Sequence, residues 1–168
     1  MLIKGRVAWV FEDNFDIDLI IGIENISTTD IAKILDNLMK PFETDFAKAI
    51  IAGDILVGGK NFGYGHPHPQ SMMGMRAAGI DCIIAESYAF PFYRSELASG
   101  MKLFECPGIS QAVERWDVLE VRPAELTVVN SARNQTLRLK PVPDIPAKIM
   151  EKGGLLPFLK SGDAAMLR

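Results

Sequence analysis

The sequence predicts an α/β domain in which short apolar strands alternate with amphipathic helices. Apolar runs of strand length recur along the chain, a glycine-rich loop separates one of them from a candidate helix, and two alternating runs near the C-terminus are typical of a β-hairpin. A chain of 168 residues can bury well over half of its unfolded surface, so we expect residues 1–168 to form a single domain.

The N-terminal third is expected to contain one strand, an extended run and two helices. GRVAWVF has the β-branched and aromatic character of a strand, and the apolar run LIIGI suits a buried strand or an extended segment. Residues 27–29 are candidate N-caps for a helix over 30–39, and a second short helix is expected over 42–50.

The central stretch alternates most clearly between strand and helix. We expect a strand at 55–59 that enters the glycine loop, a helix over 70–78 and a mostly buried strand over 80–85. A short helix that starts near Pro91 follows, because proline suits a first helical turn, and 101–106 returns as a strand.

The C-terminal third is expected to contain the hairpin and a packed tail. A short helix and a strand over 110–121 precede the two alternating runs LTVVN and QTLRLK, which SARN joins. In the tail DIPAKIMEKGGLLPFLKSG, we expect one short helix, a break at Gly153–Gly154 and a second packed segment.

Composition excludes several classes of function. The net charge of −3 offers no basic surface for a phosphate backbone, so nucleic-acid binding is not expected. The apolar runs are too short to cross a membrane, and we expect a cytoplasmic protein. Cys82 and Cys106 cannot hold an iron–sulfur cluster by themselves and suit small core residues in a reducing compartment, so no metal site is predicted in this chain.

The glycine loop is the strongest candidate site. Gly58, Gly59, Gly63 and Gly65 lie between a buried strand and a helix, where free backbone N–H groups favour a carboxylate or a phosphate. The loop lacks both the P-loop pattern and the dinucleotide pattern, so a nucleotide is not expected. A glycine loop beside a helix can equally be a packing device.

Four motifs in a fixed order then identify a resemblance. DNFDID, GDILVGGKNFGYG, AAGIDCIIAESYAFPFYRSELASGM and KIMEKGGLLPFLK together resemble the small subunit of 3-isopropylmalate dehydratase and its relatives, which correspond to the swivelling domain of aconitase. The resemblance spans nearly the whole chain. It implies a swivelling β/β/α domain, with mixed sheets that form a barrel-like core and helices packed outside.

The resemblance also implies an activity and a partner. Such a chain pairs with an aconitase-like large subunit, which carries a [4Fe–4S] cluster, while the small subunit binds no cofactor of its own. Together the two subunits would dehydrate or hydrate a small 2-hydroxy di- or tricarboxylic acid. The alternatives are a non-catalytic regulatory or binding subunit that keeps the fold, and a freestanding isomerase or hydratase that uses two histidines without iron.

The loop departs from the family where its chemistry lies. Members usually have GSSRE, in which the first serine removes a carbon-bound proton and the arginine binds a substrate carboxylate. This chain has GHPHP, which places His66 at the first serine, Pro67 at the second and His68 at the arginine.

Histidine can perform both roles, since a neutral imidazole accepts a proton and a charged one donates to a carboxylate. We therefore expect His66 to be the base and His68 a shorter carboxylate contact than arginine. The alternative is that two histidines flanked by prolines only rigidify a surface loop. Metal binding by the pair is the weaker possibility, because two ligands leave most of a zinc shell unfilled.

Several further positions follow from the resemblance. The implied substrate-binding residues are Lys60, Asn61, Gly63, Gly65 and Arg94. Arg94 could instead contact the partner or form an ion pair within the domain. Asp16 and Asp18 match the D-x-D turn of the family, for which structural hydrogen bonding is expected. Glu24 lies near a position where relatives commonly have arginine, and a carboxylate there disfavours an acidic substrate side group.

Overall fold

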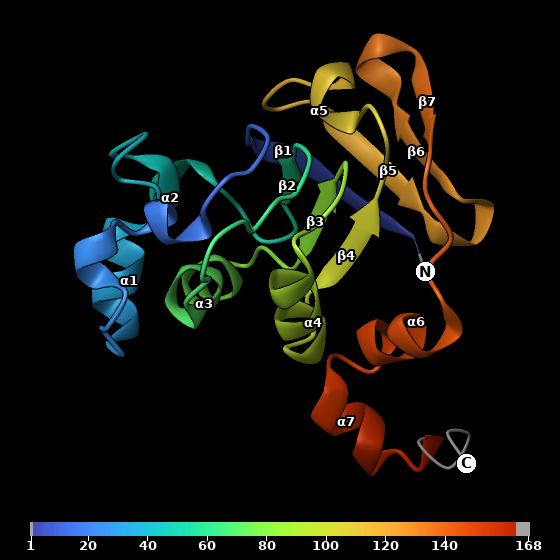
Figure 1. Ribbon diagram of the computed structural model, residues 1–168. Coiled ribbons are helices and arrows are strands. Elements are labelled where there is room, and N and C mark those ends of the chain that lie inside the picture. Colours follow the sequence, from blue (N-terminus) through green and yellow to red (C-terminus); the bar gives the residue numbers. More distant parts are fainter. Residues whose placement is uncertain (1, 164–168) are drawn as a thin grey trace.

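The chain folds around one mixed β-sheet of seven strands, in the order β4-β3-β2-β1-β5-β6-β7. The computed structural model describes residues 2–163 (Figure 1). The strands are β1 Ile3–Val10, β2 Ile55–Gly58, β3 Cys82–Ala85, β4 Lys102–Glu105, β5 Val118–Arg122, β6 Thr127–Asn130 and β7 Gln135–Arg138.

The sheet has a parallel half and an antiparallel half that meet at β1. Strands β1 to β4 run parallel to one another, whereas β5, β6 and β7 each run antiparallel to their neighbours. The sheet curls, because the segment after β7 reaches back to the end of β4, where the backbone N–H of Lys140 donates to the carbonyl of Glu105 at 2.8 Å. The barrel-like core of the prediction is therefore one curled sheet, open along much of its edge.

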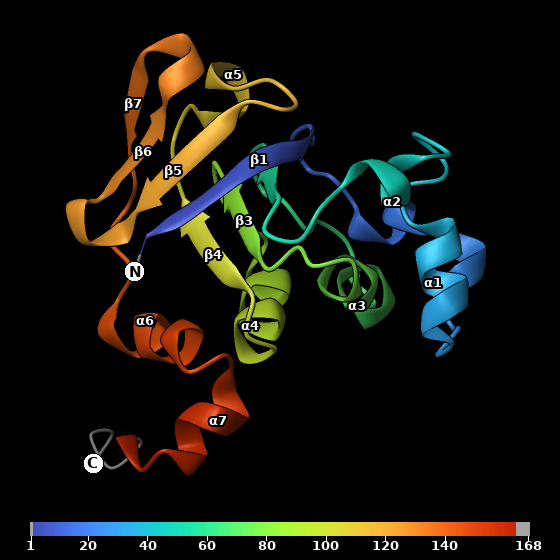
Figure 2. The ribbon, with the colours of Figure 1, turned by 180° about the vertical axis from the view of Figure 1, so that it is seen from behind.

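Helices cover the parallel half. They are α1 Ile31–Asn37, α2 Phe46–Ala49, α3 Pro69–Ala77, α4 Phe90–Ala98, α5 Ile109–Ala112, α6 Asp144–Glu151 and α7 Leu155–Lys160. Figures 1 and 2 show α3 and α4 side by side next to the parallel strands, with α1 beyond α3 and with α6 and α7 beyond α4. Among the helices of residues 2–163, none is long and apolar enough to cross a membrane.

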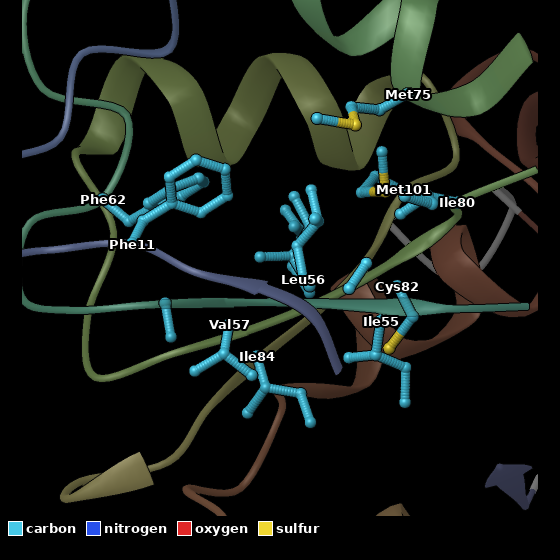
Figure 3. Close-up of a cluster of buried hydrophobic side chains, with 14 of the residues drawn as sticks. Phe11, Ile55, Leu56, Val57, Phe62, Met75, Ile80, Cys82, Ile84 and Met101 are labelled. Carbon is cyan, nitrogen blue, oxygen red and sulfur yellow. The ribbon is translucent and has the colours of Figure 1, made fainter. Parts of the chain in front are cut away.

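Strands β2 and β3 are buried on both faces, which explains their unbroken apolar sequences. Ile55, Leu56 and Val57 are fully buried, and successive side chains point to opposite faces (Figure 3). Leu56 points toward Met75 of α3, whereas Val57 lies on the other face beside Ile84. Each large aliphatic side chain buried in this way contributes about 2 kcal/mol, and the summed burial fixes where β2 ends and the glycine loop begins.

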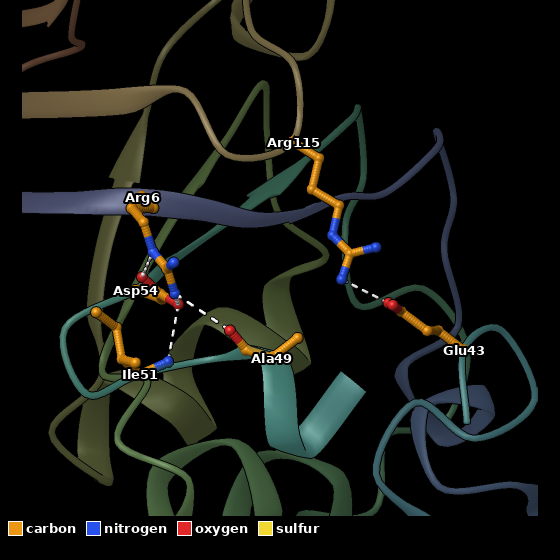
Figure 4. A network of polar contacts seen from close by, with 6 residues as sticks. All are labelled: Arg6, Glu43, Ala49, Ile51, Asp54 and Arg115. Carbon is orange, nitrogen blue, oxygen red and sulfur yellow. Dashed lines mark hydrogen bonds and ion pairs between the residues drawn. The ribbon is translucent and has the colours of Figure 1, made fainter. Parts of the chain in front are cut away.

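A charged pair fixes the start of β2 against β1. Arg6 donates from Nε to Oδ1 of Asp54 at 2.9 Å and from Nη2 to Oδ2 at 2.7 Å. The buried Asp54 carboxylate also accepts from the backbone N–H of Ile51 (Figure 4). Nearby, Arg115 lies over Trp9 and forms an ion pair with Glu43. These contacts hold β1 and β2 in register below the loop that follows each strand.

The expected strands, the hairpin and the helices at α3, α4 and α6 are confirmed, and the second short helix is confirmed over a shorter range, while two expectations near the N-terminus were wrong. LIIGI is no strand: the 3₁₀ turn η1 Ile17–Ile20 begins it, followed by η2 Ile23–Asn25. The buried Ile20 and Ile21 of this run share helical spacing with Ile17 just before it, which a short apolar run does not distinguish from a strand. Asp30, rather than residues 27–29, caps α1, and the second helix is a single turn at α2.

Two more 3₁₀ turns form tight connections in the antiparallel half. These are η3 Pro123–Glu125 and η4 Ser131–Arg133. Each ends at a residue with a left-handed backbone, at Leu126 and Asn134 respectively. Such turns reverse the chain within a few residues, so this half is a compact meander.

Candidate functional site

The glycine loop leaves the carboxyl end of β2 and is bound to the acidic turn that follows β1. The N–H of Gly59 donates to the carbonyl of Phe11 at 3.0 Å, and the N–H of Lys60 donates to Oδ1 of Asp13 at 2.6 Å. The N–H of Asn14 donates in return to the carbonyl of Lys60 at 2.7 Å. Two loops at the same edge of the sheet therefore hold each other in place, while the Lys60 side chain remains exposed.

Asn61 turns the chain inside this loop. Its backbone is left-handed, with φ of 53°, a conformation that asparagine tolerates better than most residues. Its side-chain amide donates to Oδ1 of Asn14 at 2.9 Å, and its backbone N–H donates to Oγ of Ser87 at 2.9 Å. The first residues of the loop are thus fixed from two sides.

Gly63 lies directly over α4, and no larger residue fits there. Its φ is +80°, and a Cβ on this residue would lie 2.2 Å from the ring of Phe92. Beside it, Phe62 is fully buried and packs against Phe11 and Phe92, with ring centroids 5.3 Å apart in each case. The glycine therefore lets the loop approach α4 closely, which accounts for its place in the motif.

The second part of the loop is open to solvent. Tyr64 is 55% exposed, and Gly65 and His66 are also exposed. The backbone of Gly65 has a φ of +95°, and a Cβ there would approach Oδ2 of Asp16 to 3.2 Å. The rings of His66 and His68 lie close together, with centroids 6.1 Å apart. The structure thus brings both predicted catalytic residues together at one exposed position.

His68 differs from His66 in having a buried partner. Oδ1 of Asp18 accepts from the backbone N–H of His68 at 2.9 Å, and Oδ2 lies 2.7 Å from Nδ1 of its ring. Asp18 is only 7% exposed, and its own backbone N–H donates to Oδ1 of Asp16 at 3.0 Å. His68 is also the N-cap of α3, in front of Pro69. The D-x-D turn forms hydrogen bonds, as expected, but one of them holds a candidate catalytic side chain.

Arg94 lies on the helix that supports the loop. Its guanidinium is over the ring of Phe90 at 5.8 Å, on the exposed side of α4. Within residues 2–163 it forms no hydrogen bond or ion pair, so the alternative of an ion pair inside the domain is wrong for the described residues. Its cation therefore has no charged partner among the described residues.

Glu24 lies away from the contacts that shape the loop. It lines a pocket of about 230 Å³ with Ile21, Asn37, Lys40 and Pro41. Within residues 2–163, its one hydrogen bond comes from the neighbouring Asn25. A carboxylate in this pocket adds negative charge on the side of the molecule that carries α1.

The two thiols are core residues. Burial raises the pKa of Cys82 to about 12 and that of Cys106 to about 11. Thiols with pKa values this high carry almost no thiolate at neutral pH, and the thiolate is the metal ligand and nucleophile. Within residues 2–163, no three or more histidine, cysteine, aspartate or glutamate residues lie close enough together to hold a metal ion. The described residues therefore do not form a binding site for an iron–sulfur cluster.

Known proteins resemble this chain over nearly its whole length, although no family model matches it. The isopropylmalate/citramalate isomerase small subunit of Methanocaldococcus jannaschii is 40% identical over 159 residues, or 95% of this chain and 94% of the relative. The 3-isopropylmalate dehydratase small subunit 1 of Methanopyrus kandleri is 36% identical over 95% of this chain and 93% of its own. A crystal structure of 3-isopropylmalate dehydratase from M. jannaschii matches with a TM-score of 0.86 at 28% identity, covering 99% of this chain and 98% of that one.

Proposed function

Because the chain belongs to the family of 3-isopropylmalate dehydratase small subunits, we propose that the enzyme it completes acts on a small 2-hydroxy di- or tricarboxylic acid. The chain is the small subunit of a two-subunit hydro-lyase, an enzyme that removes and adds water. Membership in this family supports the enzyme over the alternative of a non-catalytic subunit. The single observation that carries the proposal is the 40% identity, over 95% of this chain, to the isopropylmalate/citramalate isomerase small subunit.

We propose that the partner is an aconitase-like large subunit and that a [4Fe–4S] cluster resides on it. Relatives that are named as small subunits support a separate large subunit. A cluster on the partner would supply a Lewis acid for the hydroxyl group of the substrate. This chain would supply the acid–base and carboxylate-binding groups, and the complex would act in the cytoplasm.

The loop residues have distinct roles in this proposal. His66 and His68 exchange the carbon-bound proton and contact a substrate carboxylate, the two tasks of the serine and the arginine in relatives with GSSRE. Gly63 is buried and its N–H donates to the carbonyl of Phe15 at 3.1 Å, so it shapes the loop for the substrate, whereas the exposed backbone of Gly65 lets a carboxylate approach. Lys60 and Asn61 lie at the entry of the same loop, and the exposed Lys60 ammonium adds a cation for an acidic substrate.

The partner would cover the exposed side of the loop. Tyr64 is 55% exposed and Phe90 is 72% exposed, and both lie next to the Gly63 contact with α4. Exposed aromatic side chains of this size are typical of surfaces that another chain buries. Arg94, over Phe90, would then face the substrate or the partner across this boundary.

We further propose that the substrate is a malate with a small apolar substituent, of which citramalate and isopropylmalate are examples. The name of the 40% identical relative includes both acids. Glu24 disfavours an acidic side group, and a single imidazole of the loop binds a carboxylate differently from an arginine fork. The loop change would therefore tune selection among such acids.

Anaerobic turnover tests the function. The chain is assayed by itself and with its co-expressed large subunit against a panel of hydroxy acids, with alkene absorbance as the readout. We expect turnover only when both subunits are present, and the highest turnover for alkyl-substituted malates. Lack of turnover by an assembled complex with an intact cluster would contradict the proposed function.

A further inference from the structure

The contact between Asp18 and His68 does more than stabilise the loop. The carboxylate joins two points on one residue, the backbone N–H at 2.9 Å and ring atom Nδ1 at 2.7 Å. These residues are 50 positions apart in the sequence. Asp18 is nine-tenths buried, so its two oxygens face the protein and not water. A buried carboxylate with two contacts on one histidine fixes both the position and the orientation of that ring.

We propose, building on the function above, that Asp18 is a positioning residue that holds His68 by Nδ1, so that Nε2 of His68 accepts the carbon-bound proton. This assigns the base to His68, whereas the motif alignment favours His66. His66 is left as the contact for a substrate carboxylate. The two histidines thus exchange the roles expected from sequence.

The tautomer follows from the donors and acceptors present. An ionised carboxylate only accepts hydrogen bonds, so Nδ1 of His68 must carry the proton that Asp18 receives. In the neutral ring, Nε2 then bears the lone pair and is a proton acceptor. A neutral His68 in this state cannot donate to a substrate carboxylate, which argues for the role of base.

His66 lacks such a partner. Within residues 2–163 it forms no hydrogen bond or ion pair, and its one ring contact is with His68. A base must be oriented toward the proton that it removes, and an orienting carboxylate also stabilises the imidazolium that forms. His68 meets both conditions, whereas the exposed His66 meets neither.

The chemical step is a simple proton transfer. The carbon–hydrogen bond next to the substrate carboxylate breaks, the proton forms a bond to Nε2 of His68, and the electron pair moves into the forming carbon–carbon double bond. The carbon–oxygen bond of the neighbouring carbon breaks at the same time, and its electron pair leaves with the hydroxyl group as hydroxide, which together with the proton on His68 makes up the water that is lost. In the reverse direction, the imidazolium returns the proton to carbon. Asp18 remains hydrogen bonded to Nδ1 throughout and is not itself protonated.

Imidazole nitrogen NMR of the isolated chain tests the contact without the partner. The chain contains only two histidines, so His66→Gln assigns the remaining signals to His68. In the neutral ring, observed at alkaline pH, we expect His68 to carry its proton on Nδ1. A ring protonated on Nε2 instead would overturn the proposal.

Asp18→Asn provides the matched change. In this variant, the side-chain oxygen of the asparagine must accept from the backbone N–H of His68. Its N–H₂ group then faces Nδ1 of the ring and donates to it, so the ring proton must move to Nε2. In the assembled complex, we expect kcat to fall roughly a hundredfold with little change in KM. Asp13→Asn is the control, because Asp13 also accepts from a loop N–H but contacts no histidine.

The outcomes separate this inference from the proposed function. If the complex has no activity toward any hydroxy acid, the proposed function is wrong. The NMR result still tests whether Asp18 holds the proton of His68 on Nδ1. If the wild-type complex is active and Asp18→Asn shifts the tautomer without lowering kcat, Asp18 is structural and the inference is wrong. Equal losses in Asp18→Asn and Asp13→Asn would also contradict it, because they would point to loop stability.

Discussion

The two halves of the glycine loop are built in different ways. Residues 59–63 are tied to neighbouring segments by backbone hydrogen bonds and by the buried Phe62. Residues 64–68 are largely exposed, and the contact with Asp18 holds their far end. The first half carries GKNFG, which matches the resemblance, whereas the second half carries GHPHP where the resemblance leads us to expect GSSRE. On this interpretation, the scaffold of the site is kept while its reactive groups differ.

This contrast predicts that substitutions in the first half reduce stability and those in the second half reduce turnover. The buried half contributes packing, and its failure would unfold the loop together with the start of α4. The exposed half contributes few contacts to the fold, so its side chains can change with little cost in stability. The following substitutions test this division.

The largest expected effect is on turnover, in His68→Gln. Loss of a positioned base typically lowers the rate by about a thousandfold, which corresponds to about 4 kcal/mol of barrier. Thermal stability should fall modestly, because glutamine keeps the backbone contact with Asp18 but the buried carboxylate loses its contact with the ring. The kcat of the assembled complex is the readout, and His66→Gln serves as the comparison with a smaller fall in kcat. A larger fall for His66→Gln than for His68→Gln would return the base to His66.

The second-largest expected effect is a loss of stability in the variant Gly63→Ala. A methyl group at this position would overlap the ring of Phe92, and its φ of +80° strains any residue with a Cβ. We expect the free energy of unfolding to fall by about 3 kcal/mol, as measured by urea denaturation. Gly65→Ala is the control, since its nearest neighbour lies at 3.2 Å and only the strain of about 1 kcal/mol remains. Equal losses at the two glycines would mean that the halves do not differ.

Asn61→Ala should have a moderate effect on stability. It removes the hydrogen bond to Asn14 and places alanine at a left-handed position. Together these changes cost about 2 kcal/mol. Urea denaturation of the isolated chain measures the loss, and Asn61→Gly separates backbone strain from the lost hydrogen bond. If Asn61→Ala is as stable as the wild type, the first half is less rigid than its contacts indicate.

The smallest stability effect is expected for Lys60→Met. The Lys60 side chain is exposed, and the loop contacts are made by its backbone. The free energy of unfolding should therefore change by less than about 0.5 kcal/mol. If the ammonium attracts the acidic substrate, KM of the complex should rise several-fold and the rise should shrink at high salt. An unchanged KM at low salt would remove Lys60 from the substrate-binding set.

Much of this fold follows from local sequence patterns. The strands around the glycine loop, the helix after it and the terminal hairpin depend on apolar runs and turn residues that lie close together in the chain. The turn at LIIGI was missed because its buried isoleucines satisfy two kinds of structure, and only packing against α3 decides between them. Short apolar runs therefore remain the weakest part of such a prediction.

The site was predicted in part for the same physical reason. Its loop was found because glycines and both histidines are contiguous. The partner of His68 lies 50 positions away, on a turn that reaches the loop only once β1 and β2 pair. The D-x-D motif did signal hydrogen bonding, but its target depends on three-dimensional proximity. The sequence therefore predicted two candidate groups, and the structure shows that one of them has a positioning partner.

The central claim is that the changed half of the loop supplies the base, and proton exchange measures it directly. The complex is incubated with its hydroxy acid in D₂O, and deuterium entering the carbon next to the carboxylate is followed by mass spectrometry. We predict incorporation by the wild type and by His66→Gln, and almost none by His68→Gln with assembly and cluster intact. Incorporation by His68→Gln at the wild-type rate would contradict the account, because the proton would then move through another group.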